Sequence, residues 1–247
     1  FLGLDEGAES EGVDRSHMRL ARNQLALTRD LIRMSEKTGA KIVVVLASGA
    51  PVELPFADAA DAILHSYLAG QAGGEAVVRV LTGDVNPSGK LAESYPYTYL
   101  DVPSSERFAK GEASAEHREG IYVGYRYFDK VGLPVRYPFG FGLSYTSFEY
   151  ANARVEMDGA VPSAVTVEVT NTGVLEGAEV VQLYVAPTGD QGTYMAKQEL
   201  AGYAKVSLTP GETKTVRIEI AEHAFSVFDP KTDGWLRLGG EYELRVG

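Results

Sequence analysis

Cysteine is absent from the 247-residue chain, which excludes disulfides, zinc–thiolate sites and cysteine nucleophiles. The absence of cysteine does not decide between an oxidising and a reducing compartment. No apolar run approaches the roughly 20 residues that a membrane-spanning helix needs, so no membrane segment is expected. The sequence also has no secretory signal and opens on Phe1-Leu2-Gly3-Leu4 without an initiator methionine. We therefore expect a piece of a longer chain, for which cytoplasmic and secreted or periplasmic locations both stay open.

Positive charge is scarce as well. The sequence has 23 lysines and arginines against 34 aspartates and glutamates, a formal net charge of -11. Such a field repels polyanions, so neither nucleic acid nor an anionic membrane surface is an expected partner. Hydrophobic residues make up 45% of the chain, which is enough to bury a core and argues against bulk disorder.

The first part of the chain alternates between helical and strand patterns. Residues 19–36 place apolar side chains at helical spacing, and Gly39 follows as a stop signal. Residues 41–46 form a β-branched run that is typical of a buried parallel strand. A second predicted strand covers residues 62–67, and a predicted helix covers residues 75–81. This order indicates an open, mostly parallel α/β sheet.

From Tyr145 onward the pattern becomes that of short strands separated by turns. Three segments alternate at period two: residues 165–170, 180–185 and 215–220. Turn signals stand between and after them: 171–173, 187–189, 210–212 and 233–234. These features predict a β-sandwich. The expected domains are therefore an α/β domain over residues 1–145 and an all-β domain over residues 146–247.

Five segments resemble family 3 glycoside hydrolases, in the order of that family and over nearly the whole chain. They are residues 4–15, 83–91, 118–129, 137–146 and 198–212. One departure is Phe141, at a position where the family commonly has histidine. The resemblance implies an open α/β sandwich domain followed by a fibronectin type III-like β-sandwich, and a barrel domain that precedes residue 1 and carries the nucleophilic aspartate.

The same resemblance implies a retaining, exo-acting β-glucosidase or related enzyme that hydrolyses β-linked glucosides or oligosaccharides. Such an enzyme needs no metal and no organic cofactor. The chain alone would lack the nucleophile and would be inactive. The preferred sugar, the linkage and the oligomeric state, including a homo-oligomer, stay open.

Four carboxylates near the start of the chain are candidates for the general acid/base: Asp5, Glu6, Glu9 and Glu11. The family pattern selects Glu11, because Gly12 and an Asp-Arg pair follow it, and Glu9 is the second choice because the spacing of this loop varies. We expect Gly12 to let the backbone turn so that the Glu11 side chain projects toward another domain. Asp14 and Arg15 are expected to form an ion pair that fixes the loop.

Alternative functional interpretations have less support in the sequence. The glycines of residues 70–75 lack the Lys-Ser/Thr of a phosphate loop, so a nucleotide site is remote. His65 and His117 have no metal-ligand partner at suitable spacing and are expected to be structural. Tyr122, Tyr125 and Tyr127 alternate along a predicted strand and are expected to pack on a sheet. A non-catalytic carbohydrate-binding or assembly module is the alternative function, although Trp235 is the only tryptophan of the chain.

Overall fold

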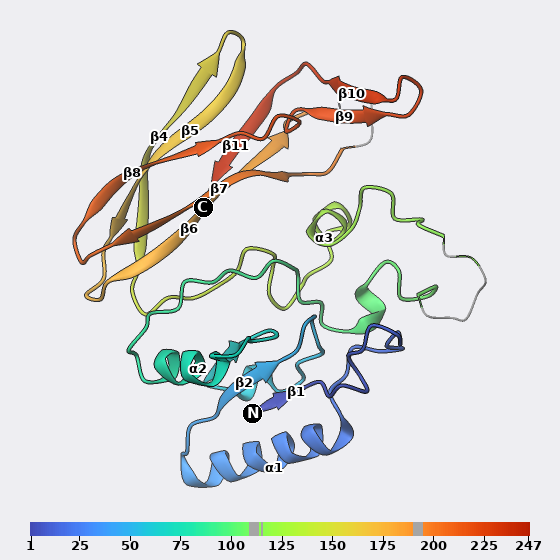
Figure 1. Ribbon diagram of the computed structural model, residues 1–247, viewed down its shortest axis with the longest axis vertical. Coiled ribbons are helices and arrows are strands. Elements are labelled where there is room, and N and C mark those ends of the chain that lie inside the picture. The colour runs from blue at the N-terminus through green and yellow to red at the C-terminus, as the bar shows by residue number, and fades with distance from the viewer. Residues whose placement is uncertain (109–113, 115, 190–194) are drawn as a thin grey trace. The chain divides into compact units, whose positions relative to one another are not determined.

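A computed structural model describes residues 1–108, 114, 116–189 and 195–247 (Figure 1). Contacts divide the chain into two compact units. The first comprises residues 1–82, 93–119 and 134–138, and the second comprises residues 83–92, 120–133 and 139–247. The chain thus crosses between the units several times. Three short segments that precede residue 145 belong by their contacts to the second unit: 83–92, 120–133 and 139–145.

The first unit contains a parallel sheet with the strand order β1-β2-β3. Its strands and helices in chain order are β1 (Leu2–Gly3), α1 (Arg22–Thr38), β2 (Val43–Ala47), β3 (Ala62–His65) and α2 (Gly73–Leu81), with short 3-10 turns at Ala57–Ala59 and Tyr99–Asp101. Its buried apolar side chains include Leu46, Val52, Leu54, Phe56 and Tyr95. The predicted alternation of helix and parallel strand is confirmed.

Helix α1 ends where the sequence predicts. Gly39 adopts the left-handed conformation at φ 71°, and its N–H donates to the Ser35 carbonyl over 2.8 Å. The Gln24 side chain ties the helix to β1, because it bonds both the N–H (3.0 Å) and the carbonyl (2.8 Å) of Gly3. Of the apolar residues at helical spacing, Leu20 is buried but precedes α1, whereas Leu27, Leu31 and Met34 on the helix are exposed. Their spacing therefore identifies the helix but not a face that is buried in the described chain.

The second unit is a β-sandwich of two antiparallel sheets, with strand orders β4-β5-β8 and β11-β6-β7, and an additional hairpin of β9 and β10. The bounds are β4 (Phe148–Asp158), β5 (Val161–Asn171), β6 (Gly177–Pro187), β7 (Glu199–Leu208), β8 (Thr213–Glu219), β9 (Ser226–Asp229), β10 (Gly234–Arg237) and β11 (Tyr242–Val246). The core is built from alternate residues of both sheets, among them Val165, Val167, Val169, Val181, Leu183, Val185 and Ile218. The buried side chains thus follow the period-two alternation from which the sandwich was predicted.

The predicted tyrosine-bearing strand is wrong. Helix α3 covers Tyr125–Val131, so Tyr125 and Tyr127 lie on a helix, and Tyr122 precedes it. Tertiary contacts explain the difference. The Tyr125 ring packs 4.8 Å from Phe139, and its hydroxyl accepts the N–H of Leu200 on β7 over 2.9 Å. Packing against the sandwich therefore outweighs the strand preference of tyrosine, which depends strongly on context.

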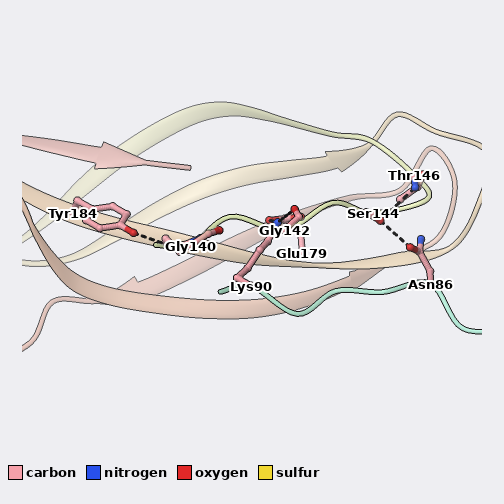
Figure 2. Close-up of polar contacts among 9 residues, drawn as sticks. Asn86, Lys90, Gly140, Gly142, Ser144, Thr146, Glu179 and Tyr184 are labelled. Atoms are coloured by element: carbon pink, nitrogen blue, oxygen red, sulfur yellow. Dashed lines mark hydrogen bonds and ion pairs between the residues drawn. The ribbon is translucent and has the colours of Figure 1, made fainter. Parts of the chain in front are cut away.

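Two of the segments that carry the family resemblance pair with each other inside the second unit (Figure 2). Leu91 donates its N–H to the Phe141 carbonyl over 2.8 Å and accepts the N–H of Gly140 over 2.7 Å. The Asn86 side chain accepts from the Ser144 hydroxyl over 3.0 Å and from the Tyr145 N–H over 2.8 Å. These hydrogen bonds therefore brace one segment against the other.

An ion pair between Lys90 and Glu179 joins the 83–91 segment to β6. Lys90 Nζ lies 2.9 Å from Glu179 Oε1, and both side chains are mostly buried, with 17% and 9% of their surface exposed. The same ammonium donates to the Gly142 carbonyl over 3.0 Å (Figure 2). The paired charges and the extra hydrogen bond compensate for the cost of removing both groups from water.

Breaking this pair should destabilise the second unit. Glu179→Gln leaves the Lys90 ammonium partly buried without its counter-ion, so we expect the free energy of unfolding to fall by about 3 kcal/mol. Urea unfolding measures the change. The matched control is Glu219→Gln, which removes one of the two exposed partners of Arg217 and should cost no more than about 0.5 kcal/mol. Equal losses of unfolding free energy in the two variants would contradict the expectation that the Lys90–Glu179 pair stabilises the unit more than an exposed pair does.

Candidate functional site

The candidate site lies at the carboxyl edge of the parallel sheet in the first unit. Strands β1, β2 and β3 all end at this edge, because parallel strands point the same way. The loops that follow them are residues 4–15, 48–51 and 66–69. The first of these, residues 4–15, is called the acid loop below because it carries the four candidate carboxylates. Its start is fixed where Leu4 donates its N–H to the Ala47 carbonyl over 3.1 Å.

Glu11 occupies the tip of a tight turn in the acid loop. The Val13 N–H reaches the Ser10 carbonyl at 3.3 Å, and these two residues form an isolated antiparallel bridge around Glu11 and Gly12. Glu11 is exposed, and its carboxylate makes no hydrogen bond or ion pair to any described residue. Gly12 does not have a left-handed backbone, and a Cβ there would meet nothing within 4 Å. Glu11 is therefore exposed at this turn, and the turn does not require glycine at position 12.

Glu9, the second candidate, is tied to the sheet edge. Its Oε1 accepts the backbone N–H of Gly49 over 2.7 Å, and the residue is partly buried. A Cβ on Gly49 would lie 2.9 Å from that oxygen, so the close approach depends on glycine. The structure thus gives the two carboxylates different environments: Glu9 is engaged by the backbone after β2, whereas Glu11 is available to a group outside the loop.

A hydrogen-bonded histidine lies beneath this edge. His65 Nε2 is 2.9 Å from the Ser48 carbonyl, which can only accept, so this nitrogen carries the proton. The Tyr95 hydroxyl therefore donates to His65 Nδ1, over 2.8 Å. The Tyr67 ring stacks on the imidazole at 3.8 Å. Burial lowers the pKa of His65, while the bond to Ser48 and the negative charge of Glu9 oppose that shift. These contacts match the structural role expected of His65.

The expected ion pair of Asp14 and Arg15 is wrong. Among the described residues, Arg15 makes no ion pair with Asp14, which is exposed. Burial raises the pKa of the Glu93 carboxyl, and the Arg15 guanidinium, together with Tyr67, partly opposes that rise. Arg15 is partly buried whereas Asp14 is exposed, so these two neighbours in sequence lie in different environments.

Glu93 is a residue of the candidate site that was not identified from the sequence. It follows the 83–91 segment but has no motif of its own, and only the fold brings it to Arg15 and Tyr67. Tyr67 was predicted as the end of a strand, whereas β3 ends at His65 and Tyr67 has a left-handed backbone at φ 52°. A non-glycine residue in this conformation is uncommon, and such residues concentrate at functional sites.

Two further observations concern ligands and membranes. In the described ranges, no group of three or more histidine and carboxylate side chains is arranged to hold a metal ion. Within the same ranges, no helix has both the length and the apolar character needed to cross a bilayer.

Comparison with known proteins defines the class. Residues 1–145 match the glycosyl hydrolase family 3 C-terminal domain, and residues 179–247 match the fibronectin type III-like domain. Since the first match alone covers more than half of the 247 residues, the chain belongs to glycoside hydrolase family 3. The resemblance stated from the sequence is confirmed, as is the fold class of an α/β domain with a fibronectin type III-like sandwich.

Relatives agree on the family and differ in activity. The chain is 42% identical to an exo-alpha-(1->6)-L-arabinopyranosidase of Bifidobacterium longum and 41% identical to thermostable beta-glucosidase B of Acetivibrio thermocellus. Each match covers 100% of this chain and 32% of the relative, so the chain spans about a third of their length. The crystal structure of a Bifidobacterium adolescentis GH3 beta-glucosidase superposes with a TM-score of 0.92 at 42% identity, over 100% of this chain and 36% of the other.

His65 should make folding stability depend on pH. Because the pKa of His65 is lowered in the folded state, the unfolded chain takes up the proton first as the pH falls. Stability is therefore complete above about pH 6.5 and declines below that value. His65→Gln can keep both hydrogen bonds but cannot titrate, so its free energy of unfolding should fall less between pH 8 and pH 5.5.

Urea unfolding at the two pH values measures this effect, and the same substitution at the exposed His117 is the matched control. The control should retain the decline of the parent chain. Parallel profiles for the parent chain and His65→Gln would rule out His65 as the source.

Proposed function

We propose that the chain is part of a retaining, exo-acting glycoside hydrolase, a β-glucosidase or a related enzyme, and that Glu11 is its general acid/base. The single observation that supports this assignment is the placement of Glu11. It stands exposed at the tip of the acid loop, in the segment that resembles the family pattern, while Glu9 is held by the Gly49 backbone. In this proposal residues 1–145 form the catalytic domain and residues 146–247 form the accompanying fibronectin-like domain.

Retaining hydrolysis uses two carboxyl groups about 5 Å apart. In the first step Glu11 gives its proton to the glycosidic oxygen as the bond from that oxygen to the anomeric carbon breaks. A carboxylate on the other face of the sugar forms the new bond to the anomeric carbon. In the second step Glu11 takes a proton from water, and the water oxygen displaces the carboxylate. No metal or organic cofactor takes part in these steps.

The nucleophile in this scheme is an aspartate on an N-terminal barrel domain, so the chain by itself would be inactive. This part of the proposal is supported by the share of the relatives that the chain covers, 32%. The barrel would also supply much of the pocket for the terminal sugar. It is therefore the domain that the chain needs as a partner for catalysis.

The substrate is proposed to be a terminal β-linked glucoside, as in the relatives named beta-glucosidases. The second candidate is an α-L-arabinopyranoside, because an exo-alpha-(1->6)-L-arabinopyranosidase is 42% identical to this chain. Both sugars carry the leaving oxygen in the equatorial position. They differ in the orientation of one ring hydroxyl and in the presence of the hydroxymethyl group, so one acid/base geometry serves both.

The catalytic assignment predicts a change that depends on the leaving group. In the complete enzyme, Glu11→Gln removes the proton donor, so kcat/KM should fall about 10²- to 10⁴-fold for alkyl glucosides and cellobiose. Nitrophenyl and other activated aryl glucosides need little protonation, and their cleavage step should be much less affected. Pre-steady-state kinetics separates this step from the later hydrolysis of the glycosyl-enzyme.

Glu9→Gln is the matched variant, with the same change two residues away. It should lower kcat/KM to the same extent for both substrate classes, because it removes the charged contact to the Gly49 N–H. A leaving-group effect in Glu9→Gln but not in Glu11→Gln would transfer the role to Glu9. A complete relative that binds glucosides but cleaves none of them would favour the carbohydrate-binding or assembly module instead.

A further inference from the structure

The β9–β10 hairpin of the second unit (Figure 1) carries an exposed pair of aromatic side chains. Phe228 on β9 lies directly opposite Trp235 on β10, so both side chains are on the same face of the hairpin. Trp235 keeps 54% of its surface exposed, and Phe228 keeps 50%. A ligand that covers this pair gains free energy, because contact removes apolar area from water.

The Trp235 ring is supported from one side. The His223 imidazole stacks parallel to the indole, with ring centroids 4.3 Å apart and an interplanar angle of 5°. The Phe228 ring meets the indole edge-on, at 5.9 Å and 78°. Since the imidazole covers one face of the indole and half of the residue is still exposed, the opposite face is accessible. A ring that is already oriented loses little side-chain entropy when a ligand binds to it.

The hairpin itself is anchored at its base and at its turn. At the base, Leu238 donates its N–H over 2.9 Å to the carbonyl of Phe225, a residue of the sandwich core. At the turn, the Asp229 carboxylate accepts the N–H of Lys231 over 3.0 Å and the hydroxyl of Thr232 over 3.1 Å. The aromatic pair therefore stands on a firm support, although each strand has only four residues.

A hydrogen-bond donor lies on the same face as the aromatic pair. Arg237 follows Trp235 by two residues on β10, and alternate residues of a strand point to the same side. Arg237 is exposed, and its side chain makes no hydrogen bond or ion pair with a described residue. Because a guanidinium offers several N–H groups, Arg237 can donate to the hydroxyl groups of a ligand that rests on the indole.

The size of this face favours a small ligand over a protein partner. A stable protein–protein interface buries about 800 Å² on each partner. A strand of four residues is about 13 Å long, and two paired strands lie about 4.8 Å apart, so one face of this hairpin offers far less area than that. Leu236, the exposed apolar neighbour of Trp235, points to the other face and does not extend the surface.

We propose that Trp235, Phe228 and Arg237 form a binding site for a neutral β-glucan chain, in which one glucose ring stacks on the open face of the Trp235 indole. A β-linked glucose ring presents C–H groups on its two faces and hydroxyls around its rim. The C–H groups suit an aromatic surface, and the hydroxyls suit the Arg237 donors. The chain belongs to a family of glycoside hydrolases, so sugars are the molecules that the enzyme meets. The net charge of -11 favours a neutral polysaccharide over an acidic one.

This site goes beyond the proposed function and does not depend on the role of Glu11, which lies in the first unit. Tryptophan fluorescence tests it directly, because Trp235 is the only tryptophan of the 247-residue chain. Titration of this chain with cellohexaose should give a saturable change in emission, with a shift to shorter wavelength as the indole leaves water. An emission spectrum that stays constant up to millimolar cellohexaose would overturn the inference.

Affinity electrophoresis tests the same site in the complete enzyme. The gel contains hydroxyethyl cellulose, a neutral and soluble cellulose derivative, which should retard the parent enzyme. Trp235→Ala removes the stacking surface, so the dissociation constant should rise at least about tenfold. If this variant does not fold, Arg237→Ala is the second variant, and it should also weaken the retardation because a hydrogen-bond donor is lost.

Two matched controls separate this site from general adhesion of exposed apolar groups. Tyr203→Ala removes another exposed aromatic ring of the second unit, on β7, and Leu236→Ala removes the exposed side chain next to Trp235. Both should migrate like the parent enzyme. Equal retardation of the parent and Trp235→Ala would show that the hairpin face is covered or unused in the complete enzyme, and the inference would be wrong. A loss in Tyr203→Ala as large as that in Trp235→Ala would also refute it.

Discussion

Parallel pairing of β1, β2 and β3 is the constraint on which the candidate site depends. Because the strands run the same way, the loops after them emerge at one edge, and residues distant in sequence meet there. Glu9 comes from the first loop, Gly49 from the second and Tyr67 from the third. β1 is only two residues long, yet its register against Leu46 and Ala47 fixes where the acid loop begins. That register therefore determines where the loop that carries Glu11 leaves the sheet.

The segments that carry the family resemblance serve different purposes. The Glu11 carboxylate of the acid loop has no hydrogen-bond or ion-pair partner among the described residues, which suits a group proposed to react with substrate. The 83–91 and 137–146 segments instead bond to each other and to β6 through Asn86, Lys90 and Glu179. Their recurrence in the family is explained by the geometry of a braced connection. A family pattern alone therefore does not distinguish a catalytic residue from a structural one.

Beneath the acid loop, polar groups are linked rather than isolated. His65 joins Ser48 to Tyr95, and the Tyr67 ring stacks on the imidazole. Such a connected network limits how far any one member moves, because each displacement leaves another buried group unsatisfied. The left-handed backbone of Tyr67 fits this arrangement, since its cost is sustained only where neighbouring contacts determine the conformation.

The amino-acid sequence determined the elements and the class. Residue spacing located α1, β2, α2 and the strands β5, β6 and β8, because side-chain periodicity is a local property of helix and strand. The ordered segments indicated family 3 and Glu11. Tertiary structure alone decided that residues 125–131 form a helix, that Arg15 is partly buried without pairing to Asp14, and that Glu9 is bound to Gly49. Each of these features depends on contacts between residues that are far apart in the sequence, and no local sequence pattern specifies such contacts.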